Sequence, residues 1–274
     1  MTKEKAATTK VGSRQISFVR MATTTSTNDT GLLPLLKAGF EADYPEYFLT
    51  WVSVGSGAAL DLGRAGVVDV CFTHSPAQEV IFYNQGFATS HPHIMFNQFI
   101  GVGPRGVTPA PPDSLTALFY DIYHNELPFV SRGDLSGTHV RELEIWASLG
   151  IADPTDNPNY QEAHAGMLAT IELAAVLGAY TLSDDATWLR AKTDNPFVNF
   201  RLHQVTTVVQ PASMNQYSVL PINPLAPFPV PPVEPINEDG AEDFTAWLLG
   251  TNAENIINGF QIAGQQVFTY NAHA

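Results

Sequence analysis

SRGDLSGTH, the segment Ser131–His139, stands between an apolar run and an amphipathic one. The apolar run Leu127–Val130 predicts a strand, and the spacing of apolar residues over 143–149 predicts a helix. The segment between them is therefore a tight turn that opens a helix. The first N–H groups of a helix have no partner within it, and the helix dipole adds partial positive charge there. The turn is a predicted anion site, and without a Gly-Lys-Ser/Thr ending it does not favour a nucleotide.

The composition restricts the classes of function. The chain has 274 residues, enough for two domains of ordinary size or one large domain, and a net charge of −14. Five of its 13 basic residues lie within the first 20 positions, so the remainder offers no basic face and no nucleic-acid partner is expected. A small enclosed anion site depends instead on local N–H dipoles and an arginine, so the acidic balance does not exclude one.

The cysteine count, the apolar runs and the first residues bear on the redox state and the compartment of the protein. The single cysteine, Cys71, excludes an intrachain disulfide and is expected to fill the core. No run of eighteen apolar residues is present, so no membrane-spanning helix is expected. The first residues, Met1–Gln15, contain no apolar segment typical of an intact signal peptide. The sequence alone leaves the compartment open.

Strand-like and helix-like segments alternate along the chain, which predicts an α/β fold with largely parallel sheets. The expected strands are Gln15–Met21, Phe48–Val54, Asp69–Thr73, His93–Val102, Pro128–Ser131, Ala179–Ser183 and Arg201–Val209. The expected helices are Thr30–Ala42, Gly57–Ala65, Ala77–Gln85, Asp113–His124, Thr138–Leu149, Gly166–Val176, Asp185–Lys192, Glu238–Leu249 and Asn252–Phe260.

No flexible linker separates the two halves of the chain, so two domains would have to be discontinuous. The apolar run Ile94–Val102 and the segment Thr206–Ile222 are the expected crossovers between them. The proline-rich segment Pro221–Pro235 is expected to lie extended over the surface.

Three further turns resemble the first, because each places small hydroxyl residues between a strand and a helix. They are Thr23–Asn28, Gly55–Gly57 and His74–Pro76. A single such turn is explained by ordinary helix capping by serine or threonine. Four of them, one with an arginine, favour an anion site, because the carboxyl ends of parallel strands gather at one edge of a sheet.

Five segments in order also resemble a known family. ATTTSTND…GLL, VGSGAALDLGRAGVVDV, SRGDLSGTHVRELEIW, AYTLSDDATWL and NQYSVLPINP are together similar to the tungstate-binding proteins of ABC importers. These are type II periplasmic-binding-protein folds, whose relatives bind molybdate, sulfate and phosphate. The resemblance implies two lobes, each a mostly parallel sheet flanked by helices, with the ligand in the cleft between them.

The polar start of the chain predicts a disordered tail over residues 1–14. The resemblance also implies lobe boundaries and partners. Residues 15–97 with 210–274 would form the first lobe, and 98–209 the second lobe. The family implies a monomeric solute receptor without a cofactor, located in the periplasm or outside the cell, that works with an ABC permease.

The family motifs map onto named residues of this chain. Thr-Thr-Thr-Ser corresponds to Thr23–Ser26, and the second turn contributes Ser56. The Ser-Arg-Gly-Asp motif contributes Arg132 for charge and leaves Asp134 to orient that arginine or cap the turn. The implied oxyanion-binding set is Thr24, Thr25, Ser26, Ser56, Arg132, Ser136, Gly137 and Thr138.

The chain departs from the family at two places. It has His164 within a segment where relatives often read Ala-Gly-Gln-Gly-Met. It has Asp185 where they often have an arginine, which removes a positive charge near the second lobe. His164 is a candidate donor to the cleft, or else a surface histidine.

The residue types favour a fully deprotonated oxyanion. Hydrogen phosphate needs an acceptor in its site, whereas sulfate, molybdate and tungstate need donors only. The third turn supplies His74 and Ser75 rather than a carboxylate, which disfavours phosphate. The residues do not separate sulfate from the larger anions; tungstate or molybdate is what the resemblance implies.

Parts of the sequence suggest three other functions. Ser136, His139 and Asp134 suggest a hydrolytic triad, but they are too close in sequence and no Gly-x-Ser-x-Gly elbow is present, so no enzyme is expected. A cationic metal site would use histidines without a cysteine partner; the candidates are His74, His91, His93, His139 and His164. A binding or sensor protein of the same fold without a transport role remains open.

Overall fold

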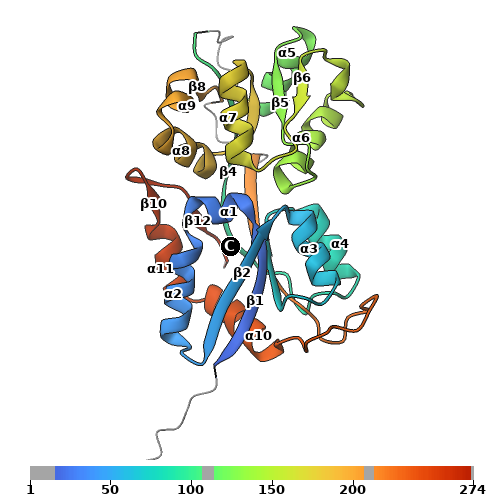
Figure 1. Cartoon of the computed structure of the whole chain (residues 1–274), viewed down its shortest axis with the longest axis vertical. Coiled ribbons are helices and arrows are strands. Elements are labelled where there is room, and N and C mark those ends of the chain that lie inside the picture. The colour runs from blue at the N-terminus through green and yellow to red at the C-terminus, as the bar shows by residue number, and fades with distance from the viewer. Residues whose placement is uncertain (1–15, 107–113, 207–212, 273–274) are drawn as a thin grey trace, which may run out of the picture.

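The computed structural model describes residues 16–106, 114–206 and 213–272. The expected tail, residues 1–14, lies outside them, as do parts of the expected strand Arg201–Val209 and of the crossover Thr206–Ile222. Figure 1 shows two bodies, one above the other, joined where the strands β4 and β9 run side by side.

The first lobe is built mainly from the two ends of the chain. Its elements are β1 (Ser17–Thr24), α1 (Thr25–Thr30), α2 (Leu33–Asp43), β2 (Tyr47–Val54), α3 (Ser56–Arg64), β3 (Val70–Thr73), α4 (Pro76–Asn84), β9 (Met214–Pro221), α10 (Glu238–Leu248), α11 (Thr251–Gly259), β10 (Gln261–Ile262), β11 (Gln265–Gln266) and β12 (Thr269–Tyr270).

The second lobe comes from the middle of the chain. Its elements are α5 (Leu115–His124), β5 (Phe129–Ser131), α6 (Gly137–Ser148), a 3₁₀ turn (Pro154–Asp156), β6 (Tyr160–Glu162), α7 (Met167–Leu177), β7 (Thr181–Asp184), α8 (Asp185–Asp194), α9 (Pro196–Arg201) and β8 (Leu202–Gln204). The long strand β4 (His93–Pro104) belongs to both lobes.

The sheet combines parallel strands with antiparallel crossovers. Strands β2, β1 and β3 are parallel neighbours, and β5 pairs with β6 in parallel. The first half of β4 pairs antiparallel with β9 and β12, whereas its second half pairs antiparallel with β7 and β8. The expected boundary between residues 97 and 98 therefore lies inside one continuous strand.

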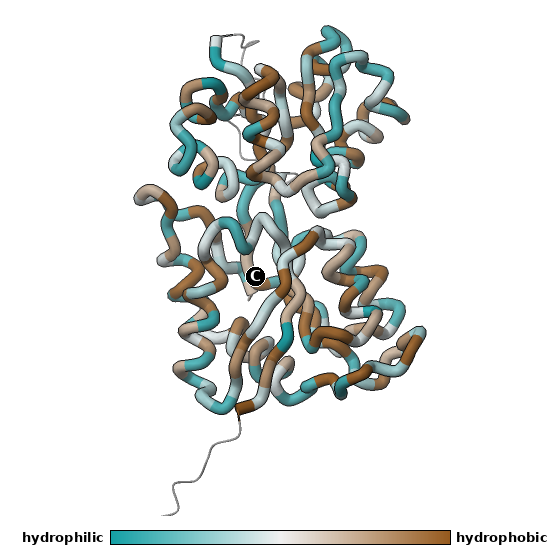
Figure 2. Tube along the Cα trace, viewed as in Figure 1, coloured by the Kyte–Doolittle hydropathy of each residue, from teal (hydrophilic) through white to brown (hydrophobic). Residues whose placement is uncertain are grey.

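Each lobe has its own apolar core, and Figure 2 shows apolar segments in both bodies. Strand β4 contributes to both cores, with Ile94 and Met95 in the first lobe and Phe99 and Ile100 in the second. Cys71 is fully buried in the first lobe, where its thiol donates to the Ala59 carbonyl oxygen. Because residues of β4 are buried in both cores, this strand is held firmly in each lobe and connects the two.

The sequence located most elements and missed some. The expected helix Thr30–Ala42 corresponds to α2 (Leu33–Asp43), and its start is wrong: Thr30 ends a separate, unexpected helix, α1, which the left-handed Gly31 (φ 87°) terminates. Of the expected strand Arg201–Val209, only Leu202–Gln204 forms a strand among the described residues. Asn195 caps the unexpected helix α9, which extends through Arg201, so the strand β8 starts only at Leu202. The expected crossover contains the strand β9, whose residues 215–221 are buried between β3 and β4.

Asp69 ties the base of the first lobe together. Its carboxylate, which is fully buried, accepts from the backbone N–H of Arg20 (2.7 Å), from Nε and Nη2 of that guanidinium (2.9 and 2.6 Å), and from the N–H of Asn237 (2.8 Å). Strands β1 and β3 and the segment before α10 therefore meet at one anion.

We expect Asp69→Ala to lower the free energy of unfolding by about 3 kcal/mol, because it leaves a partly buried charge and two N–H groups without their acceptor. Urea unfolding measures the change. The control is Asp61→Ala, whose 73% exposed side chain pairs with Arg64 at 2.8 Å and should matter by less than about 1 kcal/mol. Equal effects of the two substitutions would contradict the structural role of Asp69.

Candidate functional site

The hydroxyl-rich turns meet between the lobes. The turns after β1, β2 and β3 lie at one edge because these strands are parallel neighbours. The turn before α6 faces them from the second lobe: a Cβ on Gly55 would lie 3.5 Å from Ser136 Cα, and one on Gly137 would lie 2.7 Å from the His74 carbonyl oxygen. Only glycine fits at position 137, so this residue sets how closely the lobes approach.

Three buried hydroxyls of these turns have no hydrogen-bond partner among the described residues. They are Thr25 Oγ1, Ser56 Oγ and Thr138 Oγ1. Thr25 and Ser56 are the first residues of α1 and α3, and Thr138 is the second residue of α6, so each lies beside helical N–H groups that lack an internal acceptor. A buried donor without an acceptor is costly, and an anion between the lobes would satisfy several at once.

Three other hydroxyls of the predicted set are committed within the protein. Thr24 Oγ1 caps α1 by accepting from Thr27 N (3.3 Å), and Ser136 Oγ caps α6 by accepting from His139 N (3.4 Å). Ser26 Oγ lies 3.1 Å from His74 Nε2. Thr24 and Ser136 therefore shape the turns, and their place at helix starts leaves backbone N–H groups for contact with an anion. The Ser26 hydroxyl is paired with His74.

Arg132 is almost wholly buried and is oriented by its own turn. Its Nη2 and Nε donate to Asp134 Oδ2 at 2.6 and 3.2 Å, and Asp134 Oδ1 accepts from Ser136 N at 3.1 Å. Burial acts to raise the pKa of Asp134, but the Arg132 charge and the hydrogen bonds outweigh it and lower the pKa. Asp134 therefore orients the arginine and caps the turn together.

The turn around Arg132 has a strained backbone. Gly133 has φ 63°, and a Cβ there would lie 2.7 Å from Glu162 Cβ; Leu135 also has a positive φ, of 56°. The Leu135 N–H donates to His139 Nδ1 at 2.9 Å. This bond uses the His139 nitrogen that a hydrolytic triad with Ser136 and Asp134 would need, so the arrangement is a helix-capping turn.

The structure adds residues that the sequence did not indicate. Asn97 on β4 and Asn215 on β9 bond each other, with Asn215 Nδ2 donating to Asn97 Oδ1 at 2.8 Å. Asn97 Nδ2 donates to Asp184 Oδ1 (2.8 Å), and Asn215 Oδ1 lies 2.9 Å from His74 Nδ1. The signal for Asn97 was present, because an amide inside the apolar run Ile94–Val102 needs a polar partner.

Two partly buried carboxyl groups of α1 and α8 have raised pKa values. Burial raises the pKa of Asp29 on α1, and the Asn28 hydrogen bond and the Arg132 charge oppose this rise. Burial and the neighbouring Asp184 raise the pKa of Asp185 to about 7. The expectation of a site surrounded by donors alone considered only the third turn; the tertiary structure brings in acids from α1 and α8.

His164 is a surface histidine of the site's rim. Its side chain is 68% exposed, its Nδ1 lies 2.9 Å from the Gly133 carbonyl oxygen, and its Nε2 lies 3.4 Å from Glu162. The metal-site alternative gains no support: His91 pairs with Glu79, and no group of three metal-ligating side chains occurs within residues 16–106, 114–206 and 213–272.

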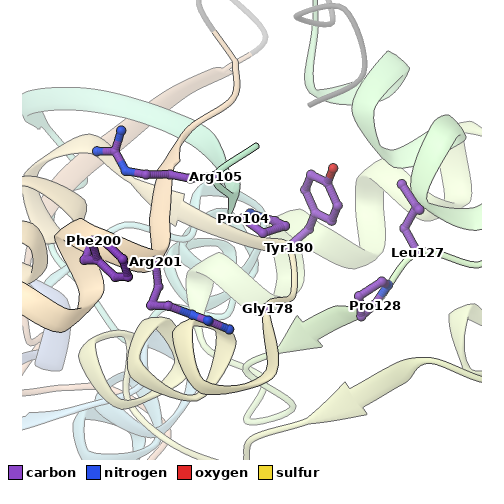
Figure 3. A pocket seen from close by; sticks show the side chains of 8 residues that line it. All are labelled: Pro104, Arg105, Leu127, Pro128, Gly178, Tyr180, Phe200 and Arg201. Atoms are coloured by element: carbon purple, nitrogen blue, oxygen red, sulfur yellow. The ribbon is translucent and has the colours of Figure 1, made fainter. Parts of the chain in front are cut away.

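Two cavities differ in their relation to these turns. One, of about 300 Å³, adjoins them and includes His74, Gly137 and Asn215 in its lining. Another, of about 500 Å³, lies in the second lobe, and Figure 3 shows its lining residues. There Arg105 and Arg201 donate to the carbonyl oxygens of Asn199 and Ala175. The larger cavity lacks the unpartnered hydroxyls of the turns, so it is a weaker candidate for the anion site.

Known proteins of similar sequence indicate the family of this chain. A family model described as the PBP superfamily domain matches residues 4–252. The tungstate-binding protein TupA of Peptoclostridium acidaminophilum is 35% identical over 258 residues, covering 92% of this chain and 85% of that protein.

Two solved structures are similar over most of their length. The tungstate-binding protein TupA from Desulfovibrio alaskensis G20 has a TM-score of 0.78 and 33% identity, covering 93% of this chain and 99% of that one. The tungstate ABC transporter structure from Geobacter sulfurreducens has a TM-score of 0.74 and 33% identity, covering 89% and 99%. The chain therefore belongs to the PBP superfamily and, within it, to the family of the TupA proteins.

Proposed function

We propose that this protein binds a tetrahedral oxyanion, tungstate or molybdate, between its lobes and serves as the solute receptor of an ABC-type uptake system. The observation that carries the proposal is the set of buried hydroxyls without partners among the described residues: Thr25 and Ser56 begin α1 and α3 of the first lobe, and Thr138 lies in the first turn of α6 in the second. Relatives named as tungstate-binding proteins support the choice of anion.

Binding would proceed by replacement of water with fixed donors. The first lobe supplies Thr25 and Ser56, and the second supplies Thr138 and the charge of Arg132. Closure removes water from the anion, so each hydrogen bond acts in a lower local dielectric. Several charge-assisted bonds, each worth roughly 1.5–3 kcal/mol, are sufficient for nanomolar affinity after the cost of closure. No bond of the ligand is made or broken in this scheme.

A role in transport implies a permease as the partner and a location outside the cytoplasmic membrane. A relative in Haloferax volcanii, 34% identical, is named as a putative ABC transporter anion-binding protein. We propose that this chain likewise delivers its anion to an ABC permease from the periplasmic or extracellular side, as a monomer without a cofactor. Among the described residues, no helix has the length and apolar character needed to cross a membrane.

We expect isothermal titration to show nanomolar binding of tungstate or molybdate and weak or no binding of phosphate. The N–H groups and the arginine of the turns only donate hydrogen bonds, whereas the proton of hydrogen phosphate needs an acceptor. Sulfate in the same buffer tests whether cavity size adds discrimination among dianions. Silence toward all four anions would contradict the proposed function.

We expect Ser56→Ala and Thr138→Val to weaken tungstate binding by about 10- to 100-fold, because each removes one charge-assisted donor. The stability of the ligand-free protein should stay constant or rise, because the deleted hydroxyls have no partner there. Ser148→Ala is the matched control: its hydroxyl donates to the Ile145 carbonyl oxygen, away from the turns, and binding should not change. Unchanged affinity in both site variants would exclude these hydroxyls from the site.

We expect Arg132→Ala to weaken binding by at least about tenfold, since it removes the buried cation of the site. The comparison with Arg105→Ala, an arginine of the other cavity that donates to the Asn199 carbonyl oxygen, separates a site effect from a general loss of positive charge. An Arg132 variant that binds as tightly as the parent protein would remove this residue from the proposed site.

A further inference from the structure

His74 lies at the end of a buried chain of hydrogen bonds that crosses the junction of the lobes. The chain runs from Asp184 at the start of α8, through Asn97 on β4 and Asn215 on β9, to His74 after β3 and then to Ser26 on α1. The five side chains are all at most 3% exposed. In this buried series of hydrogen bonds, the chemistry of each group determines which atom donates and which accepts.

The directions follow from the acceptor at one end. The Asp184 carboxylate only accepts, and it takes the N–H of Asn97, so the Asn97 oxygen must accept from Asn215. The Asn215 oxygen is then left to accept from His74 Nδ1–H. A neutral imidazole with its proton on Nδ1 presents a bare Nε2, and the Ser26 hydroxyl must donate to it.

This arrangement is unfavourable for an anion beside Ser26. The proton of the Ser26 hydroxyl points to His74, and its oxygen lies 3.2 Å from Thr24 Oγ1. An oxyanion needs donors, so the Ser26 hydroxyl becomes useful only when its hydrogen bond with His74 reverses. A proton added to His74 Nε2 achieves this, because the ring then donates to Ser26 Oγ and the Ser26 hydroxyl proton is free to turn to the anion.

We propose that His74 is a proton-linked positioning residue of the oxyanion site: it holds Ser26 as a neutral imidazole in the free protein and takes up one proton from solvent when the anion binds. This inference rests on the proposed function and specifies its pH dependence. The bond that forms is N–H at His74 Nε2; the ligand itself keeps all its bonds.

The charges around His74 support this coupling. Burial lowers its pKa, and the Arg132 charge lowers it further, whereas Asp184, the Asn215 hydrogen bond and Glu79 raise it. The phenol of Tyr217 packs on the ring, with 4.8 Å between ring centroids, and is neutral because burial raises its pKa well above the ordinary value. A dianion paired with Arg132 neutralises a charge that opposes protonation of His74 and adds attraction for the imidazolium.

The sign of the pH effect follows. The anion binds better to the protein with protonated His74, so affinity increases as the pH falls through the pKa of the complex and levels off below the pKa of the free protein. Between these values it changes by at most about tenfold per pH unit for one proton.

The test is titration with micromolar tungstate at pH 6 to 8.5, in pairs of buffers that differ in their heat of ionisation. The parent protein should take up about one proton per anion near neutral pH. In His74→Gln, the uptake should disappear and the affinity should become nearly independent of pH. His124→Gln is the matched control, since that exposed histidine on α5 bonds only its own helix at the Tyr120 carbonyl oxygen, and it should behave as the parent.

Asp185→Asn separates His74 from the nearby acid whose pKa is about 7. Proton uptake should persist in this variant. Uptake that is lost in Asp185→Asn and kept in His74→Gln would overturn the proposal and assign the proton to the carboxyl.

A second measurement does not depend on a folded variant. Nitrogen-edited NMR of the imidazole rings, with His74 assigned through its contact with Tyr217, should show a neutral ring protonated at Nδ1 in the free protein. With tungstate, both nitrogens should be protonated. A neutral ring in the complex would overturn this inference while leaving the proposed function intact; absence of binding by any oxyanion would defeat the proposed function and this inference with it.

Discussion

A buried donor must have an acceptor, and the junction between the lobes contains donors that the protein does not satisfy by itself. The hydroxyls of Thr25, Ser56 and Thr138 lack partners among the described residues and lie at the starts of helices, where N–H groups also need acceptors. The tight contact of Gly137 with the His74 carbonyl oxygen brings the two lobes together next to Thr138.

The strand β4 holds the two lobes in a defined position relative to each other. Its first half is paired within the sheet of the first lobe and its second half with β7 and β8, so the lobes share a rigid element. Asn97, near its middle, continues that link through side chains to Asp184 and Asn215. The backbone that joins the lobes therefore also carries the polar network that orients His74 and Ser26.

Charge around the site is balanced locally. The chain is acidic overall, yet Arg132 is buried and held by Asp134 at the turn where α6 begins. Asp185, the first residue of α8, has a raised pKa of about 7, because burial and Asp184 disfavour its ionised form. A carboxyl group with a raised pKa carries less negative charge near neutral pH, so the aspartate at this position opposes a bound anion less than an ordinary aspartate would.

The sequence by itself determined the turns, the order of most strands and helices, and the anion chemistry, because strand-to-helix turns with hydroxyls and an arginine are local patterns. It did not separate the hydroxyls that cap helices, Thr24 and Ser136, from those left without partners, Ser56 and Thr138, because all share the same local spacing. Only the tertiary structure decided this, and it alone brought Asn97, Asn215 and Asp184 to His74, since these contacts join segments that are 87 to 141 residues apart.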